Sequence, residues 1–106
     1  MKDIEIRELF RNTAEYDGKE VTVYGWVRGN RSSNQFGFLS VNDGSFFTPV
    51  QVVYEAASLP NFAEVSKFRL SSGVKVRGML VLTPEAKQPF EIKAEEITLV
   101  ADSDSD

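Results

Sequence analysis

The sequence predicts an all-β protein, a single five-stranded Greek-key barrel closed by short capping helices. One observation is a series of short runs in which apolar and polar residues alternate with the period of two that a half-buried strand requires. The other is a pair of helix-like segments, one before the first run and one between the third and fourth. With 106 residues the chain is long enough for one hydrophobic core and too short for two.

The first three strands are the most informative part of the chain. We expect them at Val21–Arg28, Phe36–Asn42 and Val50–Tyr54, each with alternate residues facing a core. In the second and third strands the core positions are aliphatic or tyrosine, which directs Phe38 and Gln51 away from the core. The pattern therefore predicts that Phe38 and Gln51 share an exposed surface.

A polar loop, residues 29–35, is expected between the first two of these strands, with Arg28 and Arg31 at its root. The segment Asn42–Ser45 contains Asn, Asp and Gly, which tolerate the backbone angles of a turn. We therefore interpret residues 21–54 as a meander of three strands joined by these two connections.

The flanking segments complete the barrel. A short amphipathic helix from Ile4 to Arg11, capped by Asp3, should cover one opening of the barrel. A second helix should start at Asn61, with Glu64 at capping-box spacing, and extend to about Leu70. The remaining strands are expected at 74–82 and from residue 90 onward, with a β-bulge at residues 95–96. Five strands with a helix between the third and fourth is the order of an OB-fold, whose second and third strands and adjoining loops bind oligonucleotides.

Composition excludes several classes of function. The absence of Cys and His removes disulfides, thiolate or imidazole metal sites, and the commonest nucleophiles and general bases. No apolar run approaches the roughly 20 residues of a membrane span, and the N-terminus has no apolar signal core. We therefore expect a cytoplasmic protein that binds no membrane and holds no metal or cofactor in this chain.

The charge is unevenly distributed. The net charge is −4, but three of the 16 acidic residues are Asp102, Asp104 and Asp106, so the rest of the chain is nearly neutral. Residues 1–101 are expected to form one domain, and 102–106 an acidic tail or the start of a hinge. Because the domain is not cationic, any nucleic-acid binding must depend on a local basic patch and stacking aromatic side chains.

The sequence resembles the N-terminal anticodon-binding domain of class II aminoacyl-tRNA synthetases of the aspartyl, asparaginyl and lysyl subgroup. The resemblance extends from about Ile4 to Val100 and is closest to the bacterial-type asparaginyl enzymes. It rests on residues 23–28, 31, 36–44 and 49–52. Within the subgroup, the segments 43–51 and 88–94 favour the asparaginyl members.

The resemblance implies roles for four residues. Phe38 would stack on the middle anticodon base, a uracil, and Gln51 would hydrogen-bond to its edge. Glu91 matches the acidic residue that reads the first anticodon base, and Arg31 matches a basic residue near the anticodon. To these four we add two anticodon-loop contacts that the pattern suggests, Arg28 at the root of the same loop and Phe36 on the strand face of Phe38.

The resemblance also implies a parent enzyme that uses ATP and Mg²⁺ to attach asparagine to its tRNA. The catalytic domain of that parent is not in these 106 residues, so the fragment itself should not be an enzyme. Its expected partners are the tRNA anticodon loop and the catalytic domain of the same chain, in a parent that is a homodimer. The alternatives are an aspartyl or lysyl parent, a stand-alone OB-fold that binds single-stranded nucleic acid, and a protein-interaction domain.

Overall fold

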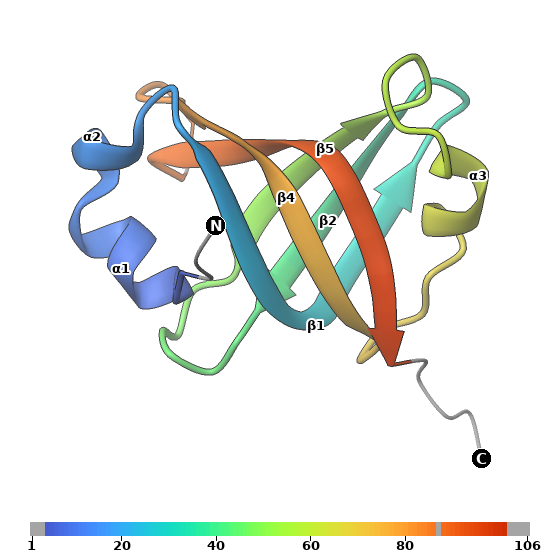
Figure 1. Cartoon of the computed structure of the whole chain (residues 1–106), viewed down its shortest axis with the longest axis horizontal. Helices are drawn as coiled ribbons and strands as arrows, with labels where there is room; N and C mark the ends of the chain where they lie inside the picture. Colours follow the sequence, from blue (N-terminus) through green and yellow to red (C-terminus); the bar gives the residue numbers. More distant parts are fainter. Residues whose placement is uncertain (1–3, 87, 102–106) are drawn as a thin grey trace.

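The computed structural model describes residues 4–86 and 88–101, which form a barrel with short helices at its ends (Figure 1). The elements are α1 (Ile6–Arg11), α2 (Thr13–Tyr16), β1 (Glu20–Ser32), β2 (Phe36–Asn42), β3 (Val50–Glu55), α3 (Phe62–Val65), β4 (Gly73–Leu82) and β5 (Phe90–Ala101). The predicted cap at Asp3 and the acidic segment 102–106 lie outside the described residues. Within those residues no helix is long and apolar enough to cross a membrane.

The five strands close in the order β1-β2-β3-β5-β4. Every neighbouring pair is antiparallel except β3 and β5, which are parallel. The long strand β1 pairs with β4 along its first half and with β2 along its second half, so it contributes to both sides of the closed barrel. The predicted five-stranded OB-fold barrel, with a helix between its third and fourth strands, is confirmed.

The core follows the predicted alternation. Buried side chains come from every strand and from Ile6 and Leu9 of α1. The strand residues among them are Val21, Val23, Val27, Leu39, Val41, Val50, Val52, Tyr54, Val74, Val76, Leu80, Phe90, Ile92, Ala94 and Ile97. Each large apolar side chain stabilises the fold by roughly 1.5–3 kcal/mol when fully buried. Because Ile6 and Leu9 belong to this core, helix α1 closes one end of the barrel, as predicted. Helix α3 lies at the other end (Figure 1).

Two β-bulges adjust the strands. The prediction that β1 stops at Arg28 is wrong, because Val27 opposes Val41 and Gly29 opposes Ser40, leaving Arg28 as an extra residue. This bulge lets the strand continue along β2 to Ser32, so the predicted loop 29–35 shrinks to residues 33–35. In β5, Arg77 opposes Glu96 and Gly78 opposes Ala94, which confirms the predicted bulge and makes residue 95 the extra one.

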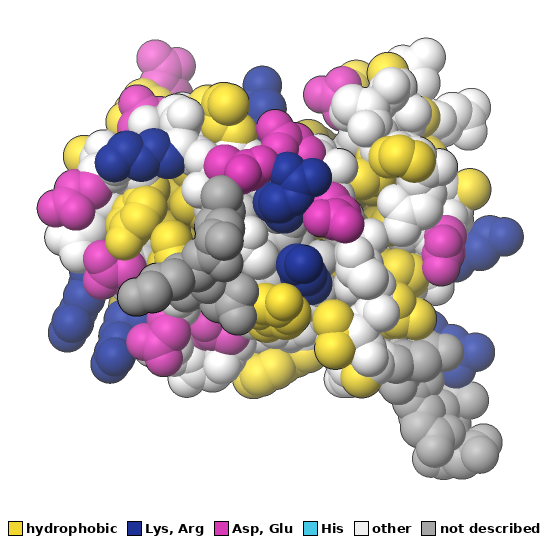
Figure 2. Space-filling model, in the orientation of Figure 1, with side chains coloured by type: hydrophobic (Ala, Val, Ile, Leu, Met, Phe, Trp, Pro, Cys, Tyr) yellow, Lys and Arg dark blue, Asp and Glu magenta, His cyan; other side chains and the backbone are white. Residues whose placement is uncertain are grey.

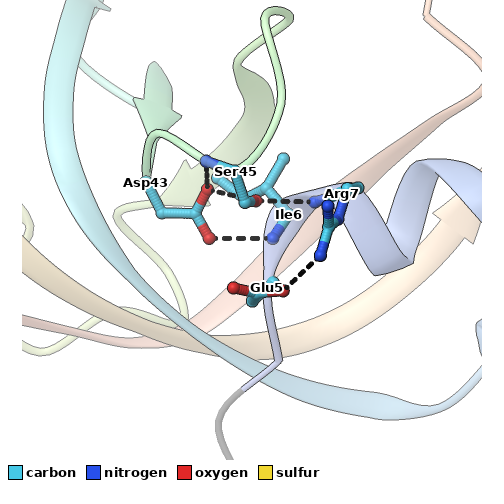
Figure 3. Close-up of polar contacts among 5 residues, drawn as sticks. All are labelled: Glu5, Ile6, Arg7, Asp43 and Ser45. Atoms are coloured by element: carbon cyan, nitrogen blue, oxygen red, sulfur yellow. Dashed lines mark hydrogen bonds and ion pairs between the residues drawn. The ribbon is translucent and has the colours of Figure 1, made fainter.

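The start of α1 is capped from a distant part of the chain (Figure 3). The helix begins later than predicted, and Glu5 at its N-cap makes no side-chain capping bond. Instead the Ile6 N–H donates to Asp43 Oδ2 and the Arg7 N–H donates to Ser45 Oγ, each at 2.9 Å. A carboxylate is stabilising at this position because the first turn of a helix has unpaired N–H groups and a positive dipole end. The β2–β3 connection thus holds α1 against the barrel.

The other helices differ from the predictions. The sequence pattern does not predict helix α2, which is followed by Gly18 with a positive φ of 75°. Helix α3 ends at Val65 and does not extend to Leu70. Its N-cap Asn61 makes no capping bond, because the Asn61 side chain donates instead to the Ile97 carbonyl at 3.0 Å. The predicted capping box at the start of α3 is therefore wrong.

Candidate nucleic-acid interface

The pairing of β2 with β3 places Phe38 and Gln51 on the same outer face of the barrel. Phe38 opposes Val53 and Ser40 opposes Gln51, so Phe38 and Gln51 are diagonal neighbours. Diagonal pairs of this kind are within reach of aromatic and long side chains. Phe38 is 37% exposed and Gln51 is half-buried. The prediction of a shared exposed surface is confirmed.

Arg31 lies against Phe38 on this surface. The two residues are cross-strand partners, and the Arg31 guanidinium carbon is 5.6 Å from the centre of the Phe38 ring. Such a cation–π contact contributes about 0.5–1 kcal/mol at an exposed site. Because guanidinium planes also stack on bases, a base that approaches Phe38 meets either the ring or the plane of Arg31.

Gln51 and Glu91 meet across the parallel pair β3 and β5. Val52 is in register with Ile92, which brings the preceding residue of each strand together on the outer face. The Gln51 Nε2 donates to Glu91 Oε1 at 3.5 Å. A glutamine amide has two N–H donors and one carbonyl acceptor, so one donor and the carbonyl of Gln51 stay available for a ligand.

Arg28 and Phe36 are less closely joined to this group. Phe36 is 46% exposed on the same strand face as Phe38 and opposes Glu55 at the far end of the β2–β3 pair. Arg28 is the exposed extra residue of the β1 bulge, and no contact places it beside Phe38 or Gln51. The structure thus brings Phe38, Gln51, Glu91 and Arg31 together, adds Phe36 at the margin, and leaves Arg28 apart.

Sequence reasoning missed Lys93 as a member of this surface. Lys93 is in register with Val53, is exposed, and lines a shallow hollow of about 270 Å³ between β3 and β5. The signal was available, since Lys93 has the same strand parity as Glu91. Alternation alone does not show which strand lies beside β5, so the position of Lys93 next to β3 depends on how the barrel closes.

A buried hydrogen-bond network lies on the core side of this surface. Burial raises the pKa of the Tyr54 hydroxyl, which donates to Asn30 Oδ1 at 2.7 Å. The Asn30 Nδ2 in turn donates to the carbonyls of Val65 and Phe68, at 3.0 and 3.1 Å. Asn30 therefore ties β1 and β3 to the segment around α3. The predicted loop at 29–35 hid this role, because a strand that continues past Arg28 turns Asn30 inward.

The backbone of β2 is pressed closely onto this network. A Cβ added at Gly37 would lie 1.9 Å from the Tyr54 ring. Only glycine allows β2 to pack this tightly over the buried ring. The position of Phe38, the next residue, is therefore fixed by core packing and not by a mobile loop.

The chemistry of the surface suits a planar heterocycle with polar edges. An aromatic ring and a guanidinium offer stacking planes, while an amide and a carboxylate offer an acceptor and donors at the edge. Within residues 4–86 and 88–101 there is no group of three or more His, Cys, Asp or Glu side chains that could hold a metal ion. These side chains provide stacking planes and edge hydrogen-bonding groups for a ligand.

Comparison with known proteins agrees with this geometry. Residues 21–100 match a family model described as an OB-fold nucleic acid binding domain. The whole chain is 54% identical over 107 aligned residues to an asparagine–tRNA ligase of Clostridium perfringens, and 53% identical over 106 to that of Alkaliphilus oremlandii. The chain spans 23% of the length of each of these ligases.

A solved structure has the same fold. The asparaginyl-tRNA synthetase of Pyrococcus horikoshii, complexed with asparaginyl-adenylate, superposes on 97% of this chain with a TM-score of 0.83. The match covers 23% of that synthetase chain at 24% sequence identity. At this identity the likeness establishes the fold alone.

Proposed function

The chain belongs to the family of OB-fold nucleic acid binding domains, and we propose that it is the anticodon-binding module of an asparagine–tRNA ligase. The observation that carries the proposal is the meeting of Phe38, Gln51 and Glu91 on one outer face. The identity of 54% to ligases of this name supports the choice of amino acid.

In this proposal Phe38 and Gln51 divide the recognition of the middle anticodon base. The Phe38 ring stacks on the base, which contributes roughly 1–3 kcal/mol and tolerates any base. Gln51 supplies specificity, because its free N–H and carbonyl complement the carbonyl and N–H on the edge of a uracil. The contact to Glu91 helps to hold the Gln51 amide in place.

Glu91 reads the first anticodon base. A carboxylate accepts hydrogen bonds and repels phosphates, so it suits a guanine edge, whose N–H groups are donors, and not the RNA backbone. Arg31 contacts phosphates or bases of the anticodon loop, and Arg28, which lies apart from this group, contacts the same loop at a separate point. Phe36 extends the apolar surface next to Phe38.

The longer protein is proposed to attach asparagine to its tRNA in the cytoplasm as a homodimer. ATP and Mg²⁺ would bind in its catalytic domain and take no part in the chemistry of residues 1–106. This module would then select the tRNA and present it to the catalytic domain of the same chain.

The proposal is tested by titrating the 106-residue chain with an RNA stem-loop that contains the asparagine anticodon. A matched stem-loop with another middle base is the control. We expect weak binding that falls as salt rises, because RNA binding releases counterions, and weaker binding still to the control loop. Equal affinity for the two loops would argue for a non-specific single-strand binder, and no binding at low salt would overturn the proposal.

A further inference from the structure

Phe47 is the most exposed large hydrophobic side chain among the described residues. It lies in the connection between β2 and β3 and is 86% exposed, against 37% for Phe38. A ring in this position costs solubility without helping to fill the core. Neither the fold nor the proposed anticodon contacts account for it.

The Phe47 ring stands on a series of aromatic contacts. Its centre is 4.6 Å from that of Phe46, Phe46 is stacked on Phe10 at 4.8 Å, and Phe10 contacts the buried Phe90 at 4.9 Å. The connection itself is fixed by the bonds of Asp43 and Ser45 to α1 (Figure 3). The Phe47 ring is therefore restrained by its neighbours. It loses little conformational entropy when a ligand stacks on it.

The ring lies at the end of the barrel toward which the proposed path of the RNA runs. The line from Phe38 through Gln51 to Glu91 crosses from β2 to β5 and approaches the end of the barrel at which β3 and β5 begin. The β2–β3 connection is at this same end, near α1 (Figure 1). The Gln88 side chain, from the β4–β5 loop, donates to the Pro49 carbonyl at 3.1 Å, so the two loops meet here.

The shape of the exposed surface favours a single base over a protein partner. The charges of α1 are mixed, because Arg7 pairs with Glu5 at 3.4 Å and Glu8 lies on the same helix as Arg11. Affinity at Phe47 must therefore come from stacking. A protein partner would require a contiguous apolar patch. A single protruding ring fits the face of one base.

We propose that Phe47 stacks on the nucleotide immediately 5′ of the anticodon. This inference rests on the proposed function, which places the first anticodon base at Glu91 and the middle base at Gln51. The RNA then runs 5′ to 3′ from Glu91 toward Phe38, and the nucleotide that precedes the anticodon reaches the end of the barrel where Phe47 stands. Because stacking tolerates any base, Phe47 adds affinity without adding sequence discrimination.

The test compares Phe47→Ala with the wild-type chain on two RNAs. One is the asparagine anticodon stem-loop, and the other is the same RNA with an abasic site 5′ of the anticodon. Phe47→Ala should weaken binding of the intact loop by about 5- to 150-fold, the range for loss of one stacked base. It should leave binding of the abasic loop unchanged. Leu70→Ala, which removes another exposed side chain (59%) next to β4, is the matched control and should change neither.

A second measurement does not depend on the variant. The wild-type chain is mixed with a stem-loop that carries 2-aminopurine at the nucleotide 5′ of the anticodon, whose fluorescence should fall when it stacks on Phe47. Unchanged fluorescence on binding, equal affinity of Phe47→Ala and wild type for the intact loop, or an equal loss on both RNAs would each overturn the inference. If Phe38→Ala weakens binding while Phe47→Ala does not, the proposed function survives and this inference fails. Absence of any RNA binding overturns both.

Discussion

Two outer faces of the same barrel use arginine in opposite ways. On the face of β2, β3 and β5, Arg31 lies against the Phe38 ring, and no carboxylate lies within 4.0 Å of it in the described part of the chain. On the face of β1, β4 and β5, Arg77 forms ion pairs with Glu20, Glu95 and Glu96. Figure 2 shows acidic side chains gathered around a basic one over these strands.

The difference indicates which face is open to a polyanion. The charge of Arg77 is more than neutralised by its three neighbours, so Arg77 offers little attraction to a phosphate. Arg31 keeps its charge and offers a plane for stacking. We infer that nucleic-acid binding is confined to the face of β2, β3 and β5, although the barrel as a whole is nearly neutral.

The largest expected effect comes from the packing behind the binding face. Gly37→Ala forces a Cβ into the Tyr54 ring, at 1.9 Å, and should lower the free energy of unfolding by about 3 kcal/mol. Gly29→Ala is the matched control, because its Cβ would meet Ser40 Oγ at 3.6 Å, an ordinary contact. Gly29→Ala should lower the free energy of unfolding by less than about 1 kcal/mol. Urea unfolding of both variants gives the two values, and equal midpoints would contradict the packing argument.

Phe38→Ala tests whether the two faces differ in RNA binding. It should weaken binding of every anticodon stem-loop by roughly 1–3 kcal/mol while leaving the fold intact, because the ring is 37% exposed. Tyr24→Ala removes an aromatic side chain of similar exposure, 40%, from the β1–β4 pair and should not affect RNA binding. Fluorescence anisotropy with labelled stem-loops measures the affinity of both variants. A comparable loss in the Tyr24 variant would show that the faces do not differ.

Gln51→Ala should affect discrimination more than affinity. Loss of the edge hydrogen bond penalises the uracil-containing tRNA and not a tRNA already mismatched at its middle anticodon base. The check is the aminoacylation rate of the full-length parent and its Gln51 variant on the two tRNAs. The ratio of rates should fall in the variant. A loss by the same factor on both tRNAs would mean that Gln51 only supports the surface.

The smallest effect concerns the Arg77 face and its pH dependence. Contact with the Glu95 carboxyl and the Arg77 guanidinium lowers the pKa of Glu20 below its ordinary value of 4.5. A lowered pKa contributes stability above the ordinary value, and this contribution is lost as the pH falls through the folded-state pKa. All these groups are exposed, so the effect is small.

Arg77→Gln should therefore lower the thermal midpoint slightly at pH 7, and the difference from wild type should vanish toward pH 3. The Glu8 pKa is also lowered, by Asn12 and Tyr16, but this contribution is common to both proteins and cancels in the difference. Thermal unfolding followed by circular dichroism between pH 3 and pH 7 measures the difference in thermal midpoint between the variant and wild type. A difference that stays constant with pH would contradict the assigned ion pairs.

Strand parity was sufficient to predict that Phe38 and Gln51 share an exposed surface. Alternation in β2 and β3 placed Phe38 and Gln51 on a common surface because side-chain direction in a strand depends only on position. The parallel pairing that brings Glu91 to Gln51 could not be derived from alternation, since it depends on how the barrel closes. The family resemblance supplied Glu91 instead.

The wrong predictions share a physical cause. At each of these positions, contacts with distant parts of the chain decided the structure, and the local sequence pattern did not. The cap of α1 comes from Asp43 and Ser45, and Asn61 bonds to β5 and not to its own helix. The bulge at Arg28 turned a predicted loop into strand. None of these contacts has a local sequence pattern, so they required the three-dimensional structure.

The most direct test of the two-face account is a nuclear magnetic resonance titration of the isotope-labelled chain with the asparagine anticodon stem-loop. We predict that amide shifts change at Phe38, Gln51 and Glu91 and remain constant at Tyr24 and Arg77. The control RNA with a changed middle base should produce smaller shifts at Gln51. Changes centred on β4, or spread equally over both faces, would contradict the claim that only the face of β2, β3 and β5 binds RNA.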